Sequence, residues 1–395
     1  MINRFYQHML GEKDLIFEIF NYSTARAAEI GPEHVYDFSL GNPSVPSPAS
    51  VEEALISNIR EKDPLTLHGY SPGFGIPETR DAIAADLNRR YGSHYSRKNI
   101  FVAIGAAGAL AHALRAVTNP GDKIITFAPC FSEYKTYTAG ASLTLEIIPA
   151  DIETFQVNFD AFEEALDATV TAVLINSPNN PSGIVYSTET IDRLADILSR
   201  KSQEYGHTIY LISDEPYRDI VFRGVDSPYI ANHYDHTLVC YSYSKSLSLP
   251  GERIGYLAVN PTCDQADTII EICPQISRTI GQNGAASLWQ RTLIDVCGDT
   301  SDLSVYEKNK EILYDALTSY GYHCVQPKGT FYMFPRSLEA DSQAFCKRAM
   351  SMDLMLVPGD IFACPGHFRI AYCVPQKRVE KALPIFKKLA QSYGL

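Results

Sequence analysis

Short apolar runs alternate with amphipathic segments over some 180 residues of the chain, starting near residue 77. Most of the runs are rich in β-branched residues and uninterrupted by polar ones, which is typical of strands buried on both faces of a sheet. The segments 77–92, 107–117 and 189–206 show the composition and periodicity of helices instead. This alternation predicts βα units around a mostly parallel sheet. The expected strands are 99–105, 123–127, 145–148, 171–175, 208–213, 237–242 and 254–259.

The pattern changes near residue 285, where long polar helices and short strands replace the alternation. The apolar residues between positions 15 and 20 predict an amphipathic helix that packs against another part of the molecule. The expected helices are 285–298, 304–321 and 377–394, and the expected strands lie near 323–334 and 367–373. We therefore predict a large α/β domain over residues 46–288 and a smaller α+β domain formed by residues 1–45 and 289–395.

Composition narrows the class of protein. With 395 residues, 45% hydrophobic and 20% charged, the chain resembles an ordinary soluble globular protein. The net charge of −12, without a basic cluster, argues against a nucleic-acid partner and an anionic membrane surface. Nine cysteines without a CxxC pair indicate reduced thiols in a cytoplasmic protein. Charged residues interrupt the first twenty positions, so we expect neither a signal peptide nor a membrane span there.

Polar residues directly follow four of the predicted strands. The turn GAAG (105–108) opens a helix and offers backbone N–H groups to an anion such as phosphate. The other three strands are followed by NSPNNPSG (176–183), by Asp214 with Tyr217, and by Lys245. Because ligands of an open parallel sheet bind beyond the carboxyl ends of its strands, these residues are expected to share one site.

Each feature also has an ordinary explanation when it is taken alone. Lysines are mostly solvated, glycines mark many turns, and Asp214 has the residue type of a helix cap. The stretch 176–183 consists of the usual turn residues. No full GxGxxG motif indicates a dinucleotide site, no GxSxG motif indicates a hydrolase, and His233 and His236 lack a third metal ligand at a supporting spacing. The joint occurrence of the four features at strand ends is what indicates a site.

Five motifs in a fixed order resemble the class I/II aminotransferases, pyridoxal-phosphate-dependent enzymes of fold type I. They are HGYSPGFGIPETR (68–80), NSPNNPSG (176–183), SDEPYRDIVF (213–222), SYSKSLSLPGERIGY (242–256) and GHFRIAY (366–372). The resemblance covers nearly the whole chain. It implies a large domain with a mostly parallel seven-stranded sheet flanked by helices, a smaller α+β domain, and pyridoxal 5'-phosphate as cofactor.

The resemblance also implies the roles of the residues around the cofactor ring. Lys245 is expected to form the Schiff base with the cofactor aldehyde and then to move a proton between the substrate and the cofactor. Asp214 is expected to keep the ring nitrogen protonated. Tyr217 and Asn180 are expected to hydrogen-bond the phenolic oxygen, and Phe131 to stack on the ring where the family often has Trp or Tyr.

The phosphate is expected at the other end of the same site. Tyr70 is implied to complete the phosphate site of a second subunit, which predicts a homodimer. The cradle departs from many relatives, because it has alanines where a hydroxyl residue is common, although amides alone bind phosphate. The residues expected to hold the phosphate within one chain are Gly105, Ala106, Ala107, Ser242 and Arg253.

The substrate is implied to be an amino acid or a 2-oxo acid, bound through its carboxylate. Arg369 is expected to bind this carboxylate through two parallel N–H donors, and Asn180 to make a further contact with it. Gly41 is expected to let the backbone approach the carboxylate closely. Arg278 is a candidate for a second carboxylate, or it is an ordinary surface residue.

Several reactions share this fold. Transamination between an L-amino acid and a 2-oxo acid is the leading hypothesis, a carbon–sulfur β-lyase is the second, and a decarboxylase or a cyclopropane-forming synthase is more distant. A ligand-binding domain of a transcription regulator would need a DNA-binding motif and a basic surface. The chain is acidic and reaches its first motif, SLGNPSVPSP (39–48), within about 40 residues, which argues against a regulator.

Overall fold

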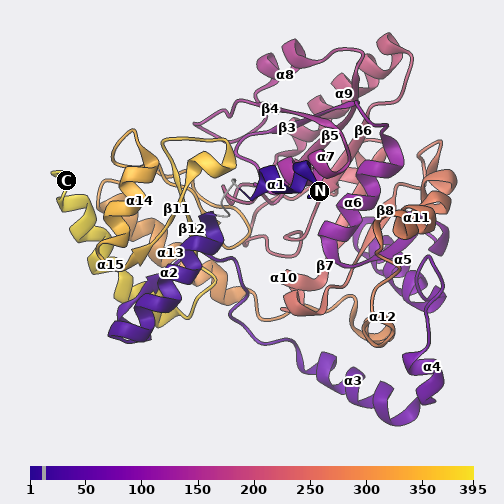
Figure 1. Ribbon diagram of the computed structural model, residues 1–395, viewed down its shortest axis with the longest axis horizontal. Coiled ribbons are helices and arrows are strands. Elements are labelled where there is room, and N and C mark those ends of the chain that lie inside the picture. The colour runs from indigo at the N-terminus through magenta and orange to yellow at the C-terminus, as the bar shows by residue number, and fades with distance from the viewer. Residues whose placement is uncertain (11–14) are drawn as a thin grey trace.

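A seven-stranded sheet forms the centre of the computed structural model, which describes residues 1–10 and 15–395 (Figure 1). The strand order is β2-β8-β7-β6-β5-β3-β4, and β8 alone runs antiparallel to its neighbours in this sheet. All seven predicted strands are present, with ends within two residues of the prediction. They are β2 (Ile100–Ala103), β3 (Lys123–Phe127), β4 (Thr144–Ile148), β5 (Val170–Asn176), β6 (Tyr210–Asp214), β7 (Thr237–Ser242) and β8 (Gly255–Val259).

Helices cover both faces of this sheet because both faces are apolar. Along β5, Leu174 faces the cluster that contains α6, α7 and α11, whereas its neighbour Val173 faces the cluster that contains α8 and α9. Near β2, β7 and β8 the second face packs against α3, α5 and α12. The uninterrupted apolar runs in the sequence are the consequence of this three-layer arrangement.

The three helices predicted at 77–92, 107–117 and 189–206 are α5, α6 and α9, with ends within two residues of the prediction. Proline opens α5, and the left-handed glycines Gly92 (φ 64°) and Gly206 (φ 73°) close α5 and α9. The helices are α3 (Ala49–Glu61), α4 (Pro64–His68), α5 (Pro77–Tyr91), α6 (Gly105–Val117), α7 (Tyr134–Gly140), α8 (Phe159–Ala165), α9 (Thr188–Tyr205), α10 (Tyr243–Ser246), α11 (Ala266–Ile280) and α12 (Ser287–Val296).

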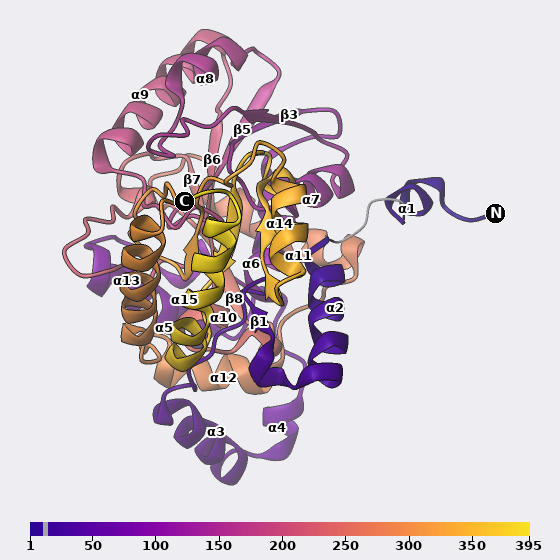
Figure 2. The same ribbon diagram turned by 90° about the vertical axis from the view of Figure 1, so that its left-hand side faces the viewer.

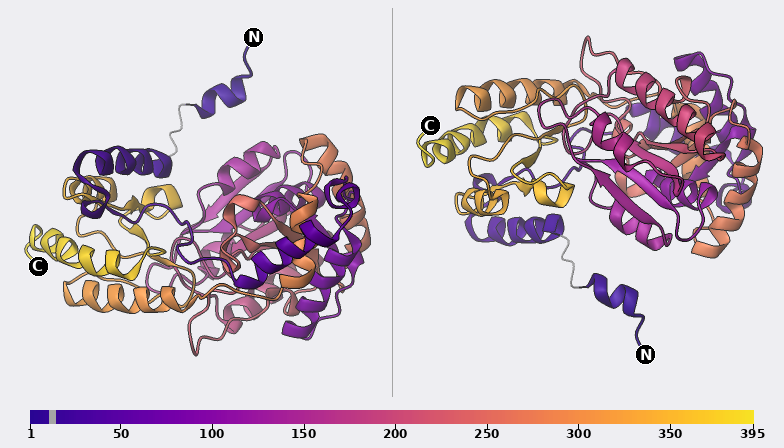
Figure 3. Two further views of the ribbon diagram at one scale, coloured as in Figure 1. Left: turned by 90° about the horizontal axis from the view of Figure 1, so that it is seen from below. Right: turned by 90° about the horizontal axis from the view of Figure 1, so that it is seen from above.

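A smaller α+β part lies beside the sheet. Figure 2 shows most of its helices in front of the large sheet, with the N-terminal helix α1 extending away to one side, and in Figure 3 the orange and yellow C-terminal helices and the indigo helix α2 gather at one end. Its elements are α1 (Arg4–Met9), α2 (Leu15–Ile30), α13 (Ser304–Ser319), α14 (Ser342–Met350), α15 (Gln376–Gln391), β1 (Tyr36–Asp37), β9 (Tyr332–Met333), β10 (Leu354–Met355), β11 (Val357–Pro358) and β12 (Phe368–Ala371).

The predicted amphipathic helix is α2, which buries Ile19 in a core shared with the large sheet. The predicted strands near 323–334 and 367–373 appear as β9 and β12 in a three-stranded antiparallel sheet with β11. The placement of the domain boundaries, at residues 45 and 288, stays a prediction. Within the described part of the chain, no helix combines the length and the apolar character needed to cross a membrane.

Candidate active site

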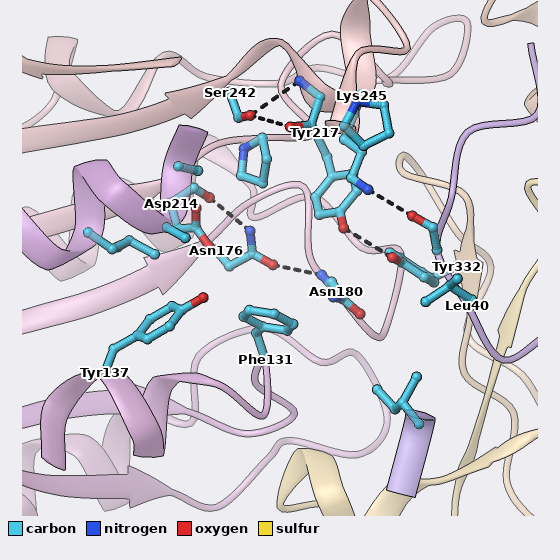
Figure 4. Close-up of a pocket in the computed structure, with 18 of the residues that line it drawn as sticks. Leu40, Phe131, Tyr137, Asn176, Asn180, Asp214, Tyr217, Ser242, Lys245 and Tyr332 are labelled. Carbon is cyan, nitrogen blue, oxygen red and sulfur yellow. Dashed lines mark hydrogen bonds between the residues drawn. The ribbon is translucent and has the colours of Figure 1, made fainter. Parts of the chain in front are cut away.

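A pocket of about 300 Å³ lies at the carboxyl edge of the large sheet (Figure 4). The strand ends of β5, β6 and β7 and the first turn of α6 contribute to its wall, together with α2, β9, β12 and the loop at residues 40–41 from the smaller part. Three cationic side chains and one carboxylate line it, so its field favours an anionic ligand. The lining residues are Ile16, Leu40, Gly41, Ala106, Ala107, Leu110, Phe131, Tyr137, Asn176, Asn180, Asp214, Pro216, Tyr217, Ser242, Ser244, Lys245, Pro250, Arg253, Tyr332 and Arg369.

Lys245 lies in the short helix α10, directly after β7. Its Nζ donates a hydrogen bond to the carbonyl oxygen of Gly41 at 2.7 Å and lies 5.5 Å from the ring centroid of Phe331. Burial lowers the pKa of the Lys245 amine to about 8, and the positive charges of Arg253 and Arg369 act in the same direction. About a tenth of this amine is therefore neutral, and hence nucleophilic, at pH 7, and about half at pH 8, which is far more than for an ordinary lysine.

Asp214 is the last residue of β6, and its two carboxylate oxygens have different surroundings. Oδ2 accepts a hydrogen bond from the hydroxyl of Tyr134 at 2.7 Å. Oδ1 is buried and has no hydrogen-bond partner among the described residues. Burial raises the pKa of Asp214 to about 7; the Tyr134 bond opposes this rise, and the charge of Glu215 adds to it. An unpartnered carboxylate oxygen in a pocket wall fits a ligand that brings a protonated nitrogen.

The first turn of α6 presents uncapped backbone amides to the pocket. Ile104 occupies the N-cap position without a side-chain hydrogen bond, and no acidic residue lies in the first turn, where Ala106 and Ala107 line the pocket. The guanidinium of Arg253 lies beside this turn. It is so close that a Cβ added to Gly105 (φ 77°) would lie 2.8 Å from its Nη2. Uncapped amides next to a guanidinium form an anion cradle that fits a phosphate.

Ser242 closes the same end of the pocket. Its Oγ accepts from the backbone N–H of Ser244 at 3.2 Å, which caps α10, and lies 2.6 Å from the Oγ of Ser244. The capping bond places both hydroxyls at the start of the turn that carries Lys245. The predicted phosphate residues of one chain therefore lie together, with Gly105 next to the lining rather than in it.

Arg369 enters the pocket from β12 and is almost fully buried. Nη1 donates to Oδ1 of Asn180 at 3.1 Å, and Nη2 donates to the carbonyl oxygen of Ser39. The guanidinium lies over the rings of Tyr332 and Phe362, and its Nε has no partner among the described residues. A buried guanidinium with an unused donor fits a carboxylate ligand.

Gly41 allows two chain segments to meet at this wall. A Cβ at this position would lie 1.8 Å from the hydroxyl oxygen of Tyr332, so only glycine fits. The Tyr332 hydroxyl in turn lies 3.1 Å from that of Tyr217. The close approach also brings the Gly41 carbonyl to Lys245.

Two residues considered in the sequence lie outside the pocket of their own chain. The side chain of Tyr70 follows α4 and is fully exposed, with a relative exposure of 109%. Arg278 lies on α11, is exposed, and donates to Gln275 one turn earlier. A single chain does not test the contribution of Tyr70 to a second subunit, which stays a prediction.

Five polar residues of the site were not predicted from the sequence, and one of them is Ser244 beside Ser242. Asn176 joins two loops, since its Nδ2 donates to the Asp214 carbonyl at 2.8 Å and its Oδ1 accepts from the Asn180 amide at 2.7 Å. Tyr134 bonds Asp214, Tyr137 lines the pocket, and Tyr332 fills the space over Gly41. The spacing of Phe131, Tyr134 and Tyr137 by three positions is a signal that points to one helical face.

The fold and the site together define a class of enzyme: a fold type I α/β protein with a buried lysine, a carboxylate and an arginine at the carboxyl edge of its sheet. The family model described as aminotransferase class I and II matches residues 33–386. The chain belongs to this family, and the predicted fold class and the predicted activity, the transfer of amino groups, are confirmed.

Relatives and solved structures agree with this assignment. The chain is 28% identical over 356 residues to an aspartate aminotransferase of Thermotoga maritima, covering 89% of this chain and 90% of the relative. A probable aspartate aminotransferase of Methanocaldococcus jannaschii is 29% identical, with 95% and 96% covered. The crystal structure of an aminotransferase from Eubacterium rectale superposes with a TM-score of 0.97 at 44% identity and covers 100% of both chains.

Proposed function

We propose that this aminotransferase uses pyridoxal 5'-phosphate in the pocket described above and moves an amino group between an L-amino acid and a 2-oxo acid. The observation that carries the proposal is the unpartnered, buried Oδ1 of Asp214 in the same pocket as the low-pKa amine of Lys245. When bound, pyridoxal phosphate supplies an aldehyde that condenses with amines and a protonated ring that accepts an electron pair.

The wall of the pocket matches the cofactor at both ends. Oδ1 of Asp214 would accept from the ring nitrogen, so that the cofactor satisfies the orphaned oxygen. Phe131 would cover a ring face, and Tyr217 and Asn180 would donate to the phenolic oxygen. The phosphate would lie on the amides of 105–107, with Arg253 and Ser242 beside it.

Lys245 would perform the chemistry that needs a side chain with two protonation states. Its amine would hold the cofactor through the aldehyde and, when the substrate amine occupies that position instead, Nζ would carry a proton from the substrate Cα to the cofactor, first as base and then as acid. The Gly41 carbonyl accepts a hydrogen bond from Nζ and so orients this buried amine in the pocket wall.

Arg369 would hold the substrate carboxylate. Its Nη1 already bonds Asn180, and its free Nε leaves donors for a planar anion. Because relatives at 28% and 29% identity are named aspartate aminotransferases, aspartate is the first amino donor to assay.

We further propose a cytoplasmic homodimer in which Tyr70 reaches the partner's phosphate. The exposed side chain of Tyr70 supports its contact with a second subunit. The nine cysteines, all free thiols, support the cytoplasmic location. Mixing the variants Lys245→Ala and Tyr70→Phe, at a cofactor concentration too low to load Tyr70→Phe alone, tests it: hybrid dimers should recover part of the activity, whereas monomers by sedimentation would contradict it.

The proposed reaction is tested by mixing the purified protein with single amino acids while recording the cofactor spectrum and assaying products. A spectral change with release of a 2-oxo acid supports transamination. Release of ammonia, pyruvate and a thiol from a cysteine conjugate would establish a β-lyase instead. Lys245→Ala is the control, and near-normal turnover in that variant would sink the proposal.

A further inference from the structure

Lys245 and Tyr217 reach the pocket from two different segments of the chain. Lys245 lies on α10, after β7, whereas Tyr217 lies on the loop that follows β6. Figure 4 shows how each bonds to the smaller part: Nζ of Lys245 donates to the Gly41 carbonyl, and the hydroxyls of Tyr217 and Tyr332 lie 3.1 Å apart. A misplacement of a reacting group by about 1 Å lowers a rate about 100-fold, so transfer of a proton by Lys245 requires that the two segments keep a fixed relation.

Tyr241 joins these two segments outside the pocket wall. It lies on β7 and is almost fully buried. Its hydroxyl donates to Oδ2 of Asp219, two residues after Tyr217. The same hydroxyl lies 2.8 Å from Oγ of Ser246, the residue next to Lys245. One phenol therefore bridges the loop that carries Tyr217 and the turn that carries Lys245.

The direction of the two bonds follows from the chemistry of the partners. A carboxylate only accepts, so the Tyr241 hydroxyl gives its one proton to Asp219, and Ser246 donates to the Tyr241 oxygen. Burial and the charge of Asp219 raise the pKa of Tyr241 well above its ordinary value, although Arg218 opposes the rise, so the phenol stays a donor. Asp219 also accepts from Nη2 of Arg90 on α5, which fixes the carboxylate.

A buried ion pair packs against the same ring. The guanidinium of Arg218 lies 4.2 Å from the ring centroid of Tyr241 and donates to Oε2 of Glu215 at 3.1 Å. Apolar side chains of the same volume often stabilise a fold as well as a buried ion pair does, so stability alone does not account for these charges. Asp214 and Tyr217 belong to the same loop and line the pocket. The ion pair and Tyr241 therefore fix the loop that presents them.

We infer that Tyr241 is a positioning residue for amino-group transfer, because its hydroxyl fixes the turn that carries Lys245 relative to the loop that carries Tyr217. The inference rests on the proposed role of Lys245 as the group that moves the substrate proton. Tyr241 does not line the pocket and acts through its neighbours. Arg369, proposed to hold the substrate carboxylate, comes from β12, so the loss of the Tyr241 bonds should slow the reaction without weakening substrate binding.

The test compares Tyr241→Phe, which removes the hydroxyl and keeps the ring, with the unmodified protein. Tyr234→Phe is the matched control, because Tyr234 is also buried outside the pocket wall and its hydroxyl donates to the Ile209 carbonyl at 2.8 Å. With the cofactor in excess, stopped-flow absorbance of the reaction with an amino donor separates the maximal rate constant from the apparent dissociation constant. An amino donor deuterated at Cα gives the kinetic isotope effect on that rate constant.

Tyr241→Phe should lower the maximal rate constant about 10- to 100-fold and leave the apparent dissociation constant unchanged. The isotope effect should rise, because proton transfer becomes slower than the other steps. A second readout needs no cofactor: hydrogen–deuterium exchange of the peptide that contains residues 243–246 should be faster in cofactor-free Tyr241→Phe than in cofactor-free Tyr234→Phe. Tyr234→Phe should match the unmodified protein in all kinetic measurements.

Ser246→Ala breaks only the bond to the turn, so it should show the same pattern, and it decides the question if Tyr241→Phe does not fold. The double variant should be no slower than Tyr241→Phe, because both changes remove one interaction. An unchanged rate constant, isotope effect or exchange rate, additive losses in the double variant, or an equal loss in Tyr234→Phe overturns the inference and leaves the proposed function intact. Absence of amino-group transfer in the unmodified protein would remove both.

Discussion

Asp214→Asn is expected to stabilise the cofactor-free protein while abolishing transamination. The carboxylate is buried at the end of β6, with one oxygen bonded to Tyr134 and the other unpartnered. Burial raises its pKa to about 7, which means that the fold destabilises the charged form. An amide of nearly the same shape has no charge to desolvate. Activity is lost because the amide does not hold the cofactor ring protonated.

The magnitude follows from the pKa difference. A rise from 3.8 to about 7 corresponds to about 4 kcal/mol between the two protonation states. Because the folded-state pKa is raised, the folded chain binds more protons than the unfolded chain between these values, so the contribution of Asp214 to stability falls as pH rises through this window. The amide leaves an unpartnered donor that costs about 1–3 kcal/mol, so the net gain at pH 8 is about 1–3 kcal/mol.

The assay is denaturant unfolding of the cofactor-free protein and of Asp214→Asn at about pH 5 and pH 8, chosen on either side of the folded pKa. The excess unfolding free energy of Asp214→Asn over the unmodified protein should be larger at pH 8 than at pH 5. A variant that is less stable at both pH values, or an advantage that does not change with pH, would refute the reasoning about the desolvated carboxylate.

Three further outcomes are expected. The rate of covalent capture of pyridoxal phosphate should rise with pH up to about 8 and then level, because the neutral amine of Lys245 is the nucleophile; a flat profile by stopped-flow absorbance contradicts this. Arg369→Lys should raise the KM for the 2-oxo acid about 10- to 100-fold, since a lysine does not form the bidentate pair, and an unchanged KM would exclude this role. Gly41→Ala should lower the unfolding free energy by about 1–3 kcal/mol through its clash with Tyr332, and adding Tyr332→Phe should recover part of the loss; no recovery would contradict the clash.

Local patterns were sufficient to predict the sheet and the residues at its edge. The strand β6, which ends at Asp214, and the strand β7, which ends three residues before Lys245, are buried on both faces, and such strands leave uninterrupted apolar runs whose ends can be located in the sequence. The resemblance then supplied Arg369, whose place next to Asn180 depends on a contact across 189 positions of the chain. No local pattern carries that information.

The missed residues have a common physical reason. Tyr332 enters the site because Gly41 lacks a Cβ, which is a property of two segments that meet only in the folded chain. Tyr134 and Tyr137 lie on a short helix, and their chemistry depends on which face that helix turns towards β6. The role of Tyr70 depends on a second subunit, so one chain alone does not test it.

The central claim is that Lys245 carries the cofactor, and peptide mapping after borohydride reduction tests it most directly. Reduction fixes a covalent link between an amine and pyridoxal phosphate, and mass spectrometry of the digest then locates the modified lysine. The modification is expected on the peptide that contains Lys245, and it should be lost in Lys245→Ala. Modification of a different lysine, or of none, in protein that has bound the cofactor would contradict it.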